Sequence, residues 1–499
     1  MRPEKIFLAI DLGAGSGRGI IGKFDNKKVE LEEVNRFDNQ VITLFGHDYW
    51  NIYDLYEKIK DSIKKAFIKY NKLDGIGIDS WGVDFVFLDR YGNLIGLPNM
   101  YRDSRVDGIP EKFYKIIPKE EIYKETGIQF LKLNSLYQIY SFKLDYPEMF
   151  NYVDRILFLP DYLNYLLTGE KLNEYTISST SQMLRADTKK WSDKILKGIG
   201  IKSSLFSEVN EPGNKIGNLD SKVREELSIE NIEVFQVASH DTASAIVAVP
   251  SKGEDWAYLS SGTWSLLGVE LDQPLINEDS YLNNYTNEGG AFNKIRFLKN
   301  VSGLWLLQES KRIWEESGFK YTYDELISNA SKAKPFSGFI NTDADIFLKP
   351  DNMPQAINEF LERTSQNKIS DHFLMVRVIL EGLAFKYREV IEVLDKILNK
   401  KLKILHIIGG GSKNMLLNQM TADSTGLQVI AGPSEATALG NILLQAKANG
   451  LISGLEEARE IVRNSFELKS FIPQDKNIWD SAYIEYKKIK EKAGDLWKN

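Results

Sequence analysis

Apolar runs and segments of helical periodicity alternate along the chain. Residues 6–12 are apolar and rich in β-forming side chains, the glycine-rich stretch GAGSGR follows, and a second apolar run covers 19–24. This order predicts a strand, a tight glycine turn and a second strand. From Asn51, apolar residues recur at helical spacing up to about Tyr70, which predicts a helix capped by Asn51.

The alternation continues further along the chain. GIGIDSWG at 75–82 predicts a strand that breaks at a glycine, and FVFLDRYGNLIG predicts a hairpin around 89–93. The stretch 151–236 carries more helix and loop signals, and a strand in VFQVASHD is predicted to end near Asp241. Because strand and helix signals keep alternating, the pattern favours an α/β fold.

The second half opens on the same plan as the first. WAYLSSGTWSLLGVEL at 256–271 predicts strand, Ser/Gly turn and strand, and a long helix is predicted at about 372–398. The apolar strand at 402–408 runs into three glycines, and a helix, a strand and a further helix are predicted to end near Ala448. Two such openings indicate a duplicated domain plan, with coincidence as the alternative.

Chain length then sets the expected number of domains. At 499 residues the chain favours two large domains. We predict an N-terminal domain at 1–248, a C-terminal domain at 249–465 and a helical tail at 466–499. The first boundary falls near a cluster of proline, serine and glycine, which is typical of a junction.

Composition narrows the class of function. The net charge is −7, so no basic excess is present to hold a nucleic-acid backbone. The chain has no cysteine, which excludes disulfides and thiolate chemistry, and its four histidines disfavour a His-rich metal site. The first apolar run is too short for a signal peptide, and no run of 18 apolar residues occurs. We therefore expect a cytoplasmic enzyme without membrane or nucleic-acid partners; the pattern indicates no particular oligomeric state.

The first candidate for chemistry is the segment from Asp11 to Arg18. Glycines let several backbone N–H groups approach a phosphate chain, and a carboxylate at a strand end can hold Mg²⁺, usually through water. Ser16 and Arg18 would add donors. The segment is neither a Walker A loop nor a dinucleotide fingerprint, since no Gly-Lys-Ser/Thr ends it and no helix follows it. A glycine hairpin without a ligand is an equally good reading of the local pattern.

The second candidate is SHDTAS at 239–244. Small residues after Asp241 suggest the start of a helix, where backbone donors suit an anion. A carboxylate there could accept the proton of a sugar hydroxyl while the oxygen of that hydroxyl attacks the γ-phosphate of ATP. Asp is also a favoured helix cap, so the local pattern leaves cap and base open.

Several other stretches carry weaker signals. The hydroxyls of SSGT at 260–263 and the glycines of GGGSKN at 409–414 could meet a nucleotide, although a plain turn and close helix packing explain them as well. WGVD at 81–84 and YRDSR at 101–105 offer aromatic and hydrogen-bonding groups for a sugar, against a buried tryptophan and a structural ion pair. NVSGLWLLQ at 300–308 predicts mainly the start of a helix.

Taken together and in order, these motifs resemble the FGGY family of carbohydrate kinases. The resemblance runs from about residue 6 to about 450 and is carried by GIDSWGVDFVFLD, GLPNMYRDSR, LPDYLNYLLTG with EYTISSTSQ, SHDTASA, LSSGTWSLLG and GGGSKNMLLNQMTADSTGLQVIAGPSEATALGN. Within the family, the motifs are similar to members that phosphorylate L-rhamnulose on O1. The alternatives are a sister kinase for fuculose, xylulose, ribulose or glycerol, and a non-sugar actin-like ATPase.

The resemblance implies a fold, cofactors and residue roles. The fold would be α/β, with two actin-like, ribonuclease H-like ATPase domains closing on ATP and sugar in the cleft between them. Asp241 would be the general base, and Asp11 would hold Mg²⁺ through water. The sugar would contact Gly82, His240, Asp241, Thr242 and Asn300. ATP would contact Ala14, Gly15, Ser16, Gly17, Arg18, Thr263, Gln308 and Gly410.

One residue departs from the family loop. That loop commonly reads Ala-Ser-Ser-Gly-Arg, and Gly15 stands here in place of its first serine. If backbone N–H groups hold most of the phosphate, the missing hydroxyl changes little. If the hydroxyl matters, ATP binds more weakly.

Overall fold

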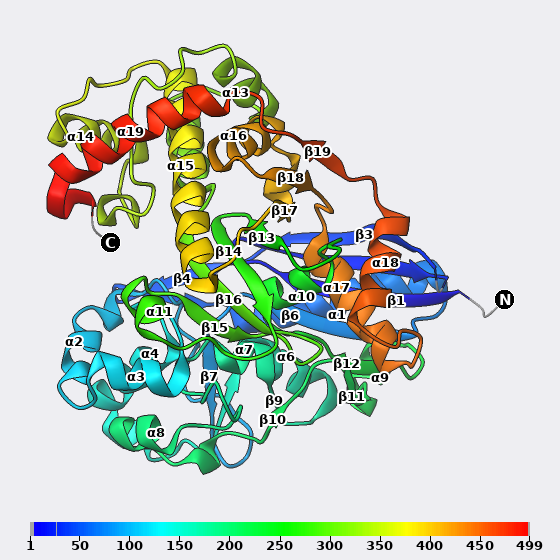
Figure 1. Cartoon of the computed structure of the whole chain (residues 1–499). Coiled ribbons are helices and arrows are strands. Elements are labelled where there is room, and N and C mark those ends of the chain that lie inside the picture. The colour runs from blue at the N-terminus through cyan, green and yellow to red at the C-terminus, as the bar shows by residue number, and fades with distance from the viewer. Residues whose placement is uncertain (1–3, 26, 498–499) are drawn as a thin grey trace. The chain divides into compact units, whose positions relative to one another are not determined.

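The computed structural model describes residues 4–25 and 27–497, which form two compact units (Figure 1). Unit 1 contains the described parts of 1–250, 270–298 and 435–466. Unit 2 contains those of 251–269, 299–434 and 467–499. Each unit is discontinuous in sequence, because the chain passes between them several times. The contiguous division predicted above, at 248/249 and 465/466, stays a prediction.

Unit 1 is built on a six-stranded sheet in the order β11-β12-β6-β1-β2-β3. The central strands β12, β6 and β1 are parallel, whereas β2 and β3 continue the sheet antiparallel and β11 closes the other edge antiparallel. The bounds are β1 (Lys5–Leu12), β2 (Ser16–Phe24), β3 (Val29–Asp38), β6 (Gly75–Ser80), β11 (Asn214–Asn218) and β12 (Glu233–Gln236). The predicted strand–turn–strand at the N-terminus is confirmed.

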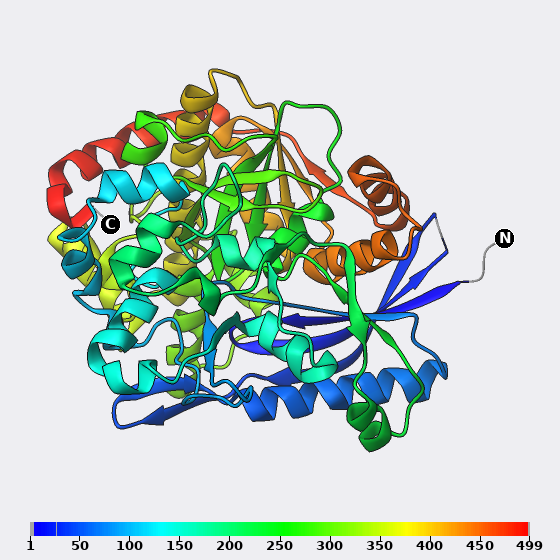
Figure 2. The same ribbon diagram turned by 90° about the horizontal axis from the view of Figure 1, so that it is seen from below.

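Alternate residues of this sheet face opposite helices. Successive side chains of a strand point to opposite faces. On β6, Ile76 and Ile78 join a hydrophobic cluster with α1 (Ile52–Tyr70), whereas a Cβ added at Gly77 would meet Asn441 of α17 (Ala436–Ala448). Helices α1 and α17 therefore cover opposite faces, and Figure 2 shows α1 running along the blue strands. The side chain of Asn51 accepts from the N–H of Asp54, which confirms the predicted cap.

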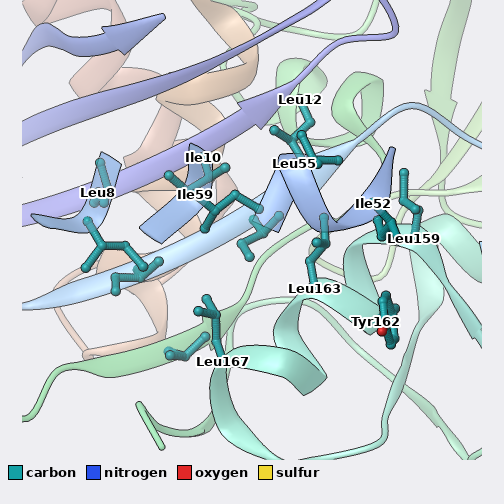
Figure 3. Close-up of a cluster of buried hydrophobic side chains, with 14 of the residues drawn as sticks. Leu8, Ile10, Leu12, Ile52, Leu55, Ile59, Leu159, Tyr162, Leu163 and Leu167 are labelled. Carbon is teal, nitrogen blue, oxygen red and sulfur yellow. The ribbon is translucent and has the colours of Figure 1, made fainter. Parts of the chain in front are cut away.

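The core of unit 1 lies between β1, α1 and α6 (Leu159–Thr168). Figure 3 shows apolar side chains from all three elements meeting there, and all are nearly inaccessible to solvent. They are Leu8, Ile10, Leu12, Ile52, Leu55, Ile59, Leu159, Tyr162, Leu163 and Leu167. Full burial of one such side chain stabilises the fold by about 1.5–3 kcal/mol, so this packing anchors the strand ends that carry the site.

The remaining elements of unit 1 are short helices, three two-stranded sheets and the edge strand of a seven-stranded sheet. The paired strands are β4 (Val41–Leu44) with β5 (His47–Trp50), β7 (Phe85–Leu88) with β8 (Arg155–Phe158), β9 (Asn173–Glu174) with β10 (Val209–Asn210), and β15 (Thr286–Gly289) with the start of β16 (Ile295–Ser302). The helices are α2 (Ile109–Tyr114), α3 (Lys119–Thr126), α4 (Ser135–Asp145), α5 (Pro147–Phe150), α7 (Tyr175–Ser179), α8 (Asp193–Ile199), α9 (Ser221–Leu227), α10 (Asp241–Val247), α11 (Glu278–Leu282) and α18 (Leu455–Ser465).

The hairpin predicted around 89–93 is only partly correct. A turn forms there, with the Asp89 carboxylate accepting backbone N–H groups. Strand β7 nevertheless pairs with β8, and the segment after the turn makes only a bridge between Leu88 and Leu94. The segment holds Gly96 at φ 76° and Pro98, and neither residue favours a regular strand.

Unit 2 contains a second sheet, in which β16, β14, β13, β17, β18 and β19 lie in this order. The bounds are β13 (Trp256–Ser261), β14 (Trp264–Leu271), β17 (Ile404–Ile408), β18 (Gln428–Ala431) and β19 (Lys469–Phe471). Its helices are α12 (Trp305–Glu316), α13 (Tyr323–Ala330), α14 (Met353–Arg363), α15 (His372–Leu398), α16 (Met415–Thr425) and α19 (Lys476–Ala493). The strand–turn–strand at 256–271 and the long helix are confirmed. Across the described residues, none of these or the other helices is both long and apolar enough to cross a bilayer.

Candidate active site

Three carboxylates lie at the carboxyl ends of the three parallel strands of the six-stranded sheet. Asp11 and Asp79 are register partners at the ends of β1 and β6, and Asp241 follows β12. A parallel β-bridge between Ser80 and His240 continues the pairing next to β6 as far as the residue before Asp241. Ligands of open α/β sheets bind outside the carboxyl ends of the strands, so this edge is the candidate site.

Arg18 brings a positive charge to this edge of the sheet. Its guanidinium contacts both the Asp11 carboxylate and Glu435, the residue before α17. Arg18 is register partner to Asp11 across the β1–β2 hairpin, which places the pair by strand geometry alone. The arginine predicted to contact ATP is therefore also an ion-pair partner of the carboxylate predicted to hold Mg²⁺.

Burial raises the pKa of Asp11, with Arg18 acting in the opposite direction and Asp241 adding to the rise. Burial also raises the pKa of Asp79 well above its usual range, and the Asp11 charge adds to the effect. The Asn441 amide donates to Asp79 Oδ2 over 2.6 Å, while the buried Oδ1 has no hydrogen-bond partner among the described residues.

This donor set fits a magnesium ion. Mg²⁺ is bound by one or two carboxylates, waters and substrate phosphates. Besides burial, the charges of Asp241 and Glu435 act to raise the pKa of Asp11, and the Arg18 guanidinium contacts both Asp11 and Glu435. Among the described residues no cluster of three or more His, Cys, Asp or Glu could bind a metal, so a metal here would need ligands from a substrate or from water.

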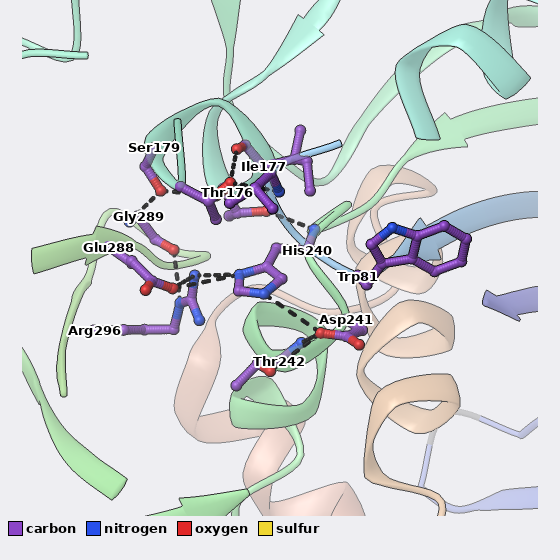
Figure 4. Close-up of polar contacts among 12 residues, drawn as sticks. Trp81, Thr176, Ile177, Ser179, His240, Asp241, Thr242, Glu288, Gly289 and Arg296 are labelled. Carbon is purple, nitrogen blue, oxygen red and sulfur yellow. Dashed lines mark hydrogen bonds and ion pairs between the residues drawn. The ribbon is translucent and has the colours of Figure 1, made fainter. Parts of the chain in front are cut away.

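Asp241 is the first residue of α10. His240 takes the N-cap position without a side-chain capping bond, so the alternative that Asp241 is the cap is wrong. The N–H and hydroxyl of Thr242 donate to Asp241 Oδ1 over 2.5 and 3.1 Å, and His240 Nε2 lies 3.5 Å from the same oxygen (Figure 4). The carboxylate side chain keeps 30% of its surface exposed. It is therefore held through one oxygen and accessible to a ligand.

The backbone before Asp241 is held by a buried carboxylate. Glu174 caps α7 by accepting from the N–H groups of Thr176 and Ile177, and it also accepts from the N–H of Ser239 over 3.2 Å. The Thr176 hydroxyl oxygen accepts from the N–H of His240 over 3.1 Å. Helix α7 and the turn before α10 are thus joined by two hydrogen bonds.

The predicted phosphate loop is an open turn between β1 and β2. The N–H of Gly13 donates to the Ser16 carbonyl over 2.9 Å, which closes the turn. Gly15 is exposed, and a Cβ there would meet nothing within 4 Å, whereas a Cβ at Gly17 would collide with the Phe37 ring. The loop therefore needs glycine for packing at 17 and offers an open backbone at 15.

The cluster 81–84, which was predicted to contact a sugar, forms a strained turn around a buried carboxylate. Asp84 Oδ2 accepts from the indole N–H groups of Trp50 and Trp81 over 2.6 and 2.8 Å. Burial raises the pKa of Asp84 to about 6, although these two hydrogen bonds act to lower it. Val83 has φ 69°, which is rare for a β-branched residue and typical of functional turns. Gly82 lies beside His240, since a Cβ there would be 3.3 Å from its Nε2.

The cluster 101–105 forms an interior network. Arg105 donates to Gln138 over 2.6 Å and lies 3.6 Å from Asp103, and the same glutamine reaches toward Asp84. Burial lowers the pKa of Arg105. The alternative of a structural ion pair is thus correct for Arg105.

Unit 2 holds the other predicted ligand contacts. Thr263 is exposed in the β13–β14 turn, and its hydroxyl donates to Gln308 Oε1 of α12 over 3.1 Å. Gly410 is open, whereas its neighbours Gly409 and Gly411 approach Ser261 so closely that a Cβ would meet it at 3.1 and 2.0 Å. The tight-packing alternative therefore holds for the flanking glycines and not for Gly410. The other predicted residue, Asn300, lies in β16.

Several site residues were not predicted. Asp79 could have been found, because it ends a predicted strand as Asp11 does. The other residues that were missed are Glu174, Glu288, Arg296 and Glu435, whose contacts with the site residues are distant in sequence. Glu174 lies 65 residues from Ser239, Arg296 lies 56 residues from His240, and Glu435 lies 417 residues from Arg18.

The chain matches known proteins over nearly its whole length. Residues 6–248 match the N-terminal domain, and residues 257–449 the C-terminal domain, of the FGGY family of carbohydrate kinases. Proteins named rhamnulokinase from Bacteroides thetaiotaomicron and Bacillus subtilis are 44% and 39% identical to it. The first match covers 96% of this chain and 98% of the relative, and the second 94% and 96%.

Solved structures of low sequence identity share the fold. A gluconate kinase from Lactobacillus acidophilus superposes with TM-score 0.82 at 18% identity, covering 99% of this chain and 100% of the other. Plasmodium falciparum glycerol kinase with ADP superposes with TM-score 0.78 at 19% identity, covering 98% of each chain. The prediction of an α/β fold with actin-like ATPase domains is confirmed. The chain belongs to the FGGY family of carbohydrate kinases.

Proposed function

We propose that this protein transfers the γ-phosphate of ATP to the O1 hydroxyl of L-rhamnulose, as a step of L-rhamnose catabolism. The substrate rests on the relatives named rhamnulokinase, which match over nearly the full chain at 44% and 39% identity. Kinases named for gluconate, xylulose and glycerol resemble the chain in fold at 18%, 17% and 19% identity. The observation that carries the mechanism is the accessible carboxylate of Asp241, whose charge acts on the pKa of Asp11.

Asp241 is the proposed general base. Its contacts with Thr242 and His240 fall on Oδ1, which leaves Oδ2 to accept a proton. As the sugar O1 forms its bond to the γ-phosphorus and the bond from phosphorus to the ADP oxygen breaks, the hydroxyl proton passes to Oδ2. A base that orients the nucleophile is what phosphoryl transfer requires, together with neutralisation of charge.

The remaining predicted residues position the two substrates. Gly82, His240, Thr242 and Asn300 would contact the sugar. The phosphates of ATP would meet the backbone of 14–18 and the Arg18 guanidinium, with Thr263, Gln308 and Gly410 as further contacts. Asp11 would hold Mg²⁺, which supplies charge neutralisation on the phosphates when bound. We also propose a cytoplasmic location, where ATP is available.

Asp241→Asn tests the base. The substitution keeps the shape and removes the proton-accepting oxygen, so kcat should fall by roughly 10²–10⁴ while the fold is retained. Asp89→Asn, in an exposed turn, is the matched control. Wild-type turnover in Asp241→Asn would remove the residue from the mechanism.

A coupled ADP-release assay tests the substrate. L-Rhamnulose should give the highest kcat/KM in a panel with fuculose, xylulose, ribulose, glycerol and no sugar. A higher value for another member of the panel would assign the protein to that sugar. Strong ATP hydrolysis that no sugar stimulates would identify a non-sugar ATPase instead.

A further inference from the structure

We propose that Arg296 and Glu288 are positioning residues that hold His240 as a neutral imidazole with its proton on Nε2. The ring then donates toward Asp241 and leaves it a full carboxylate base. The inference rests on the proposed role of Asp241. It assigns a function in the reaction to two buried residues of β15 and β16.

The three side chains form one buried cluster (Figure 4). His240, Glu288 and Arg296 are 7%, 5% and 0% exposed. Arg296 Nη2 lies 2.9 Å from His240 Nδ1 and 3.1 Å from Glu288 Oε2, and Arg296 Nε–H donates to the Gly289 carbonyl over 2.7 Å. The N–H of Gly289 donates to the Ser179 hydroxyl, which fixes the strand against α7. The guanidinium therefore has little freedom to turn away.

The contact with Arg296 decides the state of the ring. A guanidinium has only donors and stays charged in proteins. Nδ1 must then be the acceptor, since an N–H on Nδ1 would face another N–H at 2.9 Å. A neutral imidazole with an unprotonated Nδ1 carries its proton on Nε2.

Glu288 balances the charge of the arginine. Its Oε2 lies 3.4 Å from His240 Nδ1 and 3.1 Å from Arg296 Nη2, so the carboxylate forms an ion pair with the guanidinium. A buried arginine without a counter-charge would be costly. Glu288 therefore holds the guanidinium in place, and the shorter contact of Arg296 with the ring sets the tautomer.

The result is a donor aimed at the base. With its proton on Nε2, His240 faces Asp241 Oδ1 at 3.5 Å, the oxygen that Thr242 also contacts. An imidazolium would instead form an ion pair with Asp241 and weaken it as a proton acceptor. The charged groups in contact with the ring are Asp241 on α10, Glu288 on β15 and Arg296 on β16, so all three enter its pH response.

Nitrogen NMR of the histidine-labelled full chain reads the tautomer directly. The chain has four histidines, so His240→Gln assigns the signal by its loss. At pH 7 and without substrates, we expect a protonated, pyrrole-type Nε2 and an unprotonated, pyridine-type Nδ1. A proton on Nδ1, alone or in an imidazolium, would overturn the proposal.

Two variants test the assignment of roles. In Arg296→Met, Glu288 can accept from Nδ1–H, so the ring should gain a proton on Nδ1. The kcat should then fall roughly tenfold to hundredfold, the range seen when residues that orient the histidine ligands of metal sites are replaced. The acidic limb of the pH–rate profile should move to higher pH. In Glu288→Gln the ring should keep its Nε2 proton, and the acidic limb should move to lower pH.

A control separates this role from a structural one. Arg459 pairs with Glu270, donates to the Ile246 carbonyl near the C-terminal end of α10 and is similarly buried, so Arg459→Met removes a comparable ion pair that does not contact the ring. It should lower stability without changing the ring signals or the acidic limb. If the acidic limbs of the Arg296→Met and Glu288→Gln profiles move in the same direction, the proposal is overturned. If Arg296→Met does not fold, the Glu288→Gln profile and the NMR of the wild-type protein test the proposal without it. Turnover retained in Asp241→Asn would instead contradict the proposed function, leaving the tautomer measurable.

Discussion

Asp84→Asn should make the protein progressively more stable, relative to wild type, as the pH rises. Asp84 is fully buried against two indole N–H groups, and burial raises its pKa from the ordinary 3.8 to about 6. Because the folded-state pKa is the higher one, the protonated carboxyl favours folding. Its contribution is complete below 3.8 and is lost as the pH rises through about 6. Asparagine stays neutral throughout and does not incur this loss.

The magnitude follows from the two pKa values. A rise from 3.8 to about 6, at 1.36 kcal/mol for each pH unit, corresponds to about 3 kcal/mol between the low and high limits. About 1.4 kcal/mol of this falls between pH 5 and pH 7.5. Any constant effect of the amide on packing cancels when the variant is compared with wild type at both pH values.

Urea unfolding at pH 5 and pH 7.5, followed by tryptophan fluorescence, measures the difference. Asp89→Asn is the control, because hydrogen bonds from the Asn93 backbone and side chain lower the pKa of Asp89, so that it ionises below this pH window. Its stability relative to wild type should be the same at both pH values. An Asp84→Asn difference that is also flat, or that shrinks as the pH rises, would refute the reasoning about this buried carboxyl.

Three further substitutions test the support of the site. Glu174→Gln places an amide NH2 donor opposite the backbone N–H groups that the Glu174 carboxylate accepts from. We therefore expect the free energy of unfolding in urea to fall by roughly 1–3 kcal/mol and kcat to fall as well. Unchanged values would contradict the role of Glu174 in holding the turn before α10. Gly440→Ala would place a Cβ 1.8 Å from the Ser244 carbonyl, so Tm should fall, by the equivalent of about 1–3 kcal/mol or more, whereas Gly454→Ala, with nothing within 4 Å, should change it little. Asp11→Ala should weaken Mg²⁺-dependent turnover more than sugar binding, which calorimetry with the ketose and with Mg–ATP separately can show; unaltered turnover would argue against the assignment.

Local features were predictable wherever their cause is local. The strand–turn–strand at the N-terminus depends on apolar runs around glycines, and α1 depends on helical periodicity after Asn51. The hairpin after β7 was only partly predicted, because β7 pairs with β8, about 70 residues further along. A strand's partner depends on which apolar face the rest of the sheet and its helices bury, and this does not show in a short window.

The sequence by itself determined the α/β class, the family resemblance and the candidate residues, because these depend on periodicity, composition and motif order. The tertiary structure alone decided which groups meet. It paired Asp11 with Asp79 through the β1–β6 register and placed Arg296 against His240, 56 residues away. It also assigned 435–466 to unit 1, since α17 covers one face of the first sheet. Such contacts arise from burying several elements against one another, so no single segment encodes them.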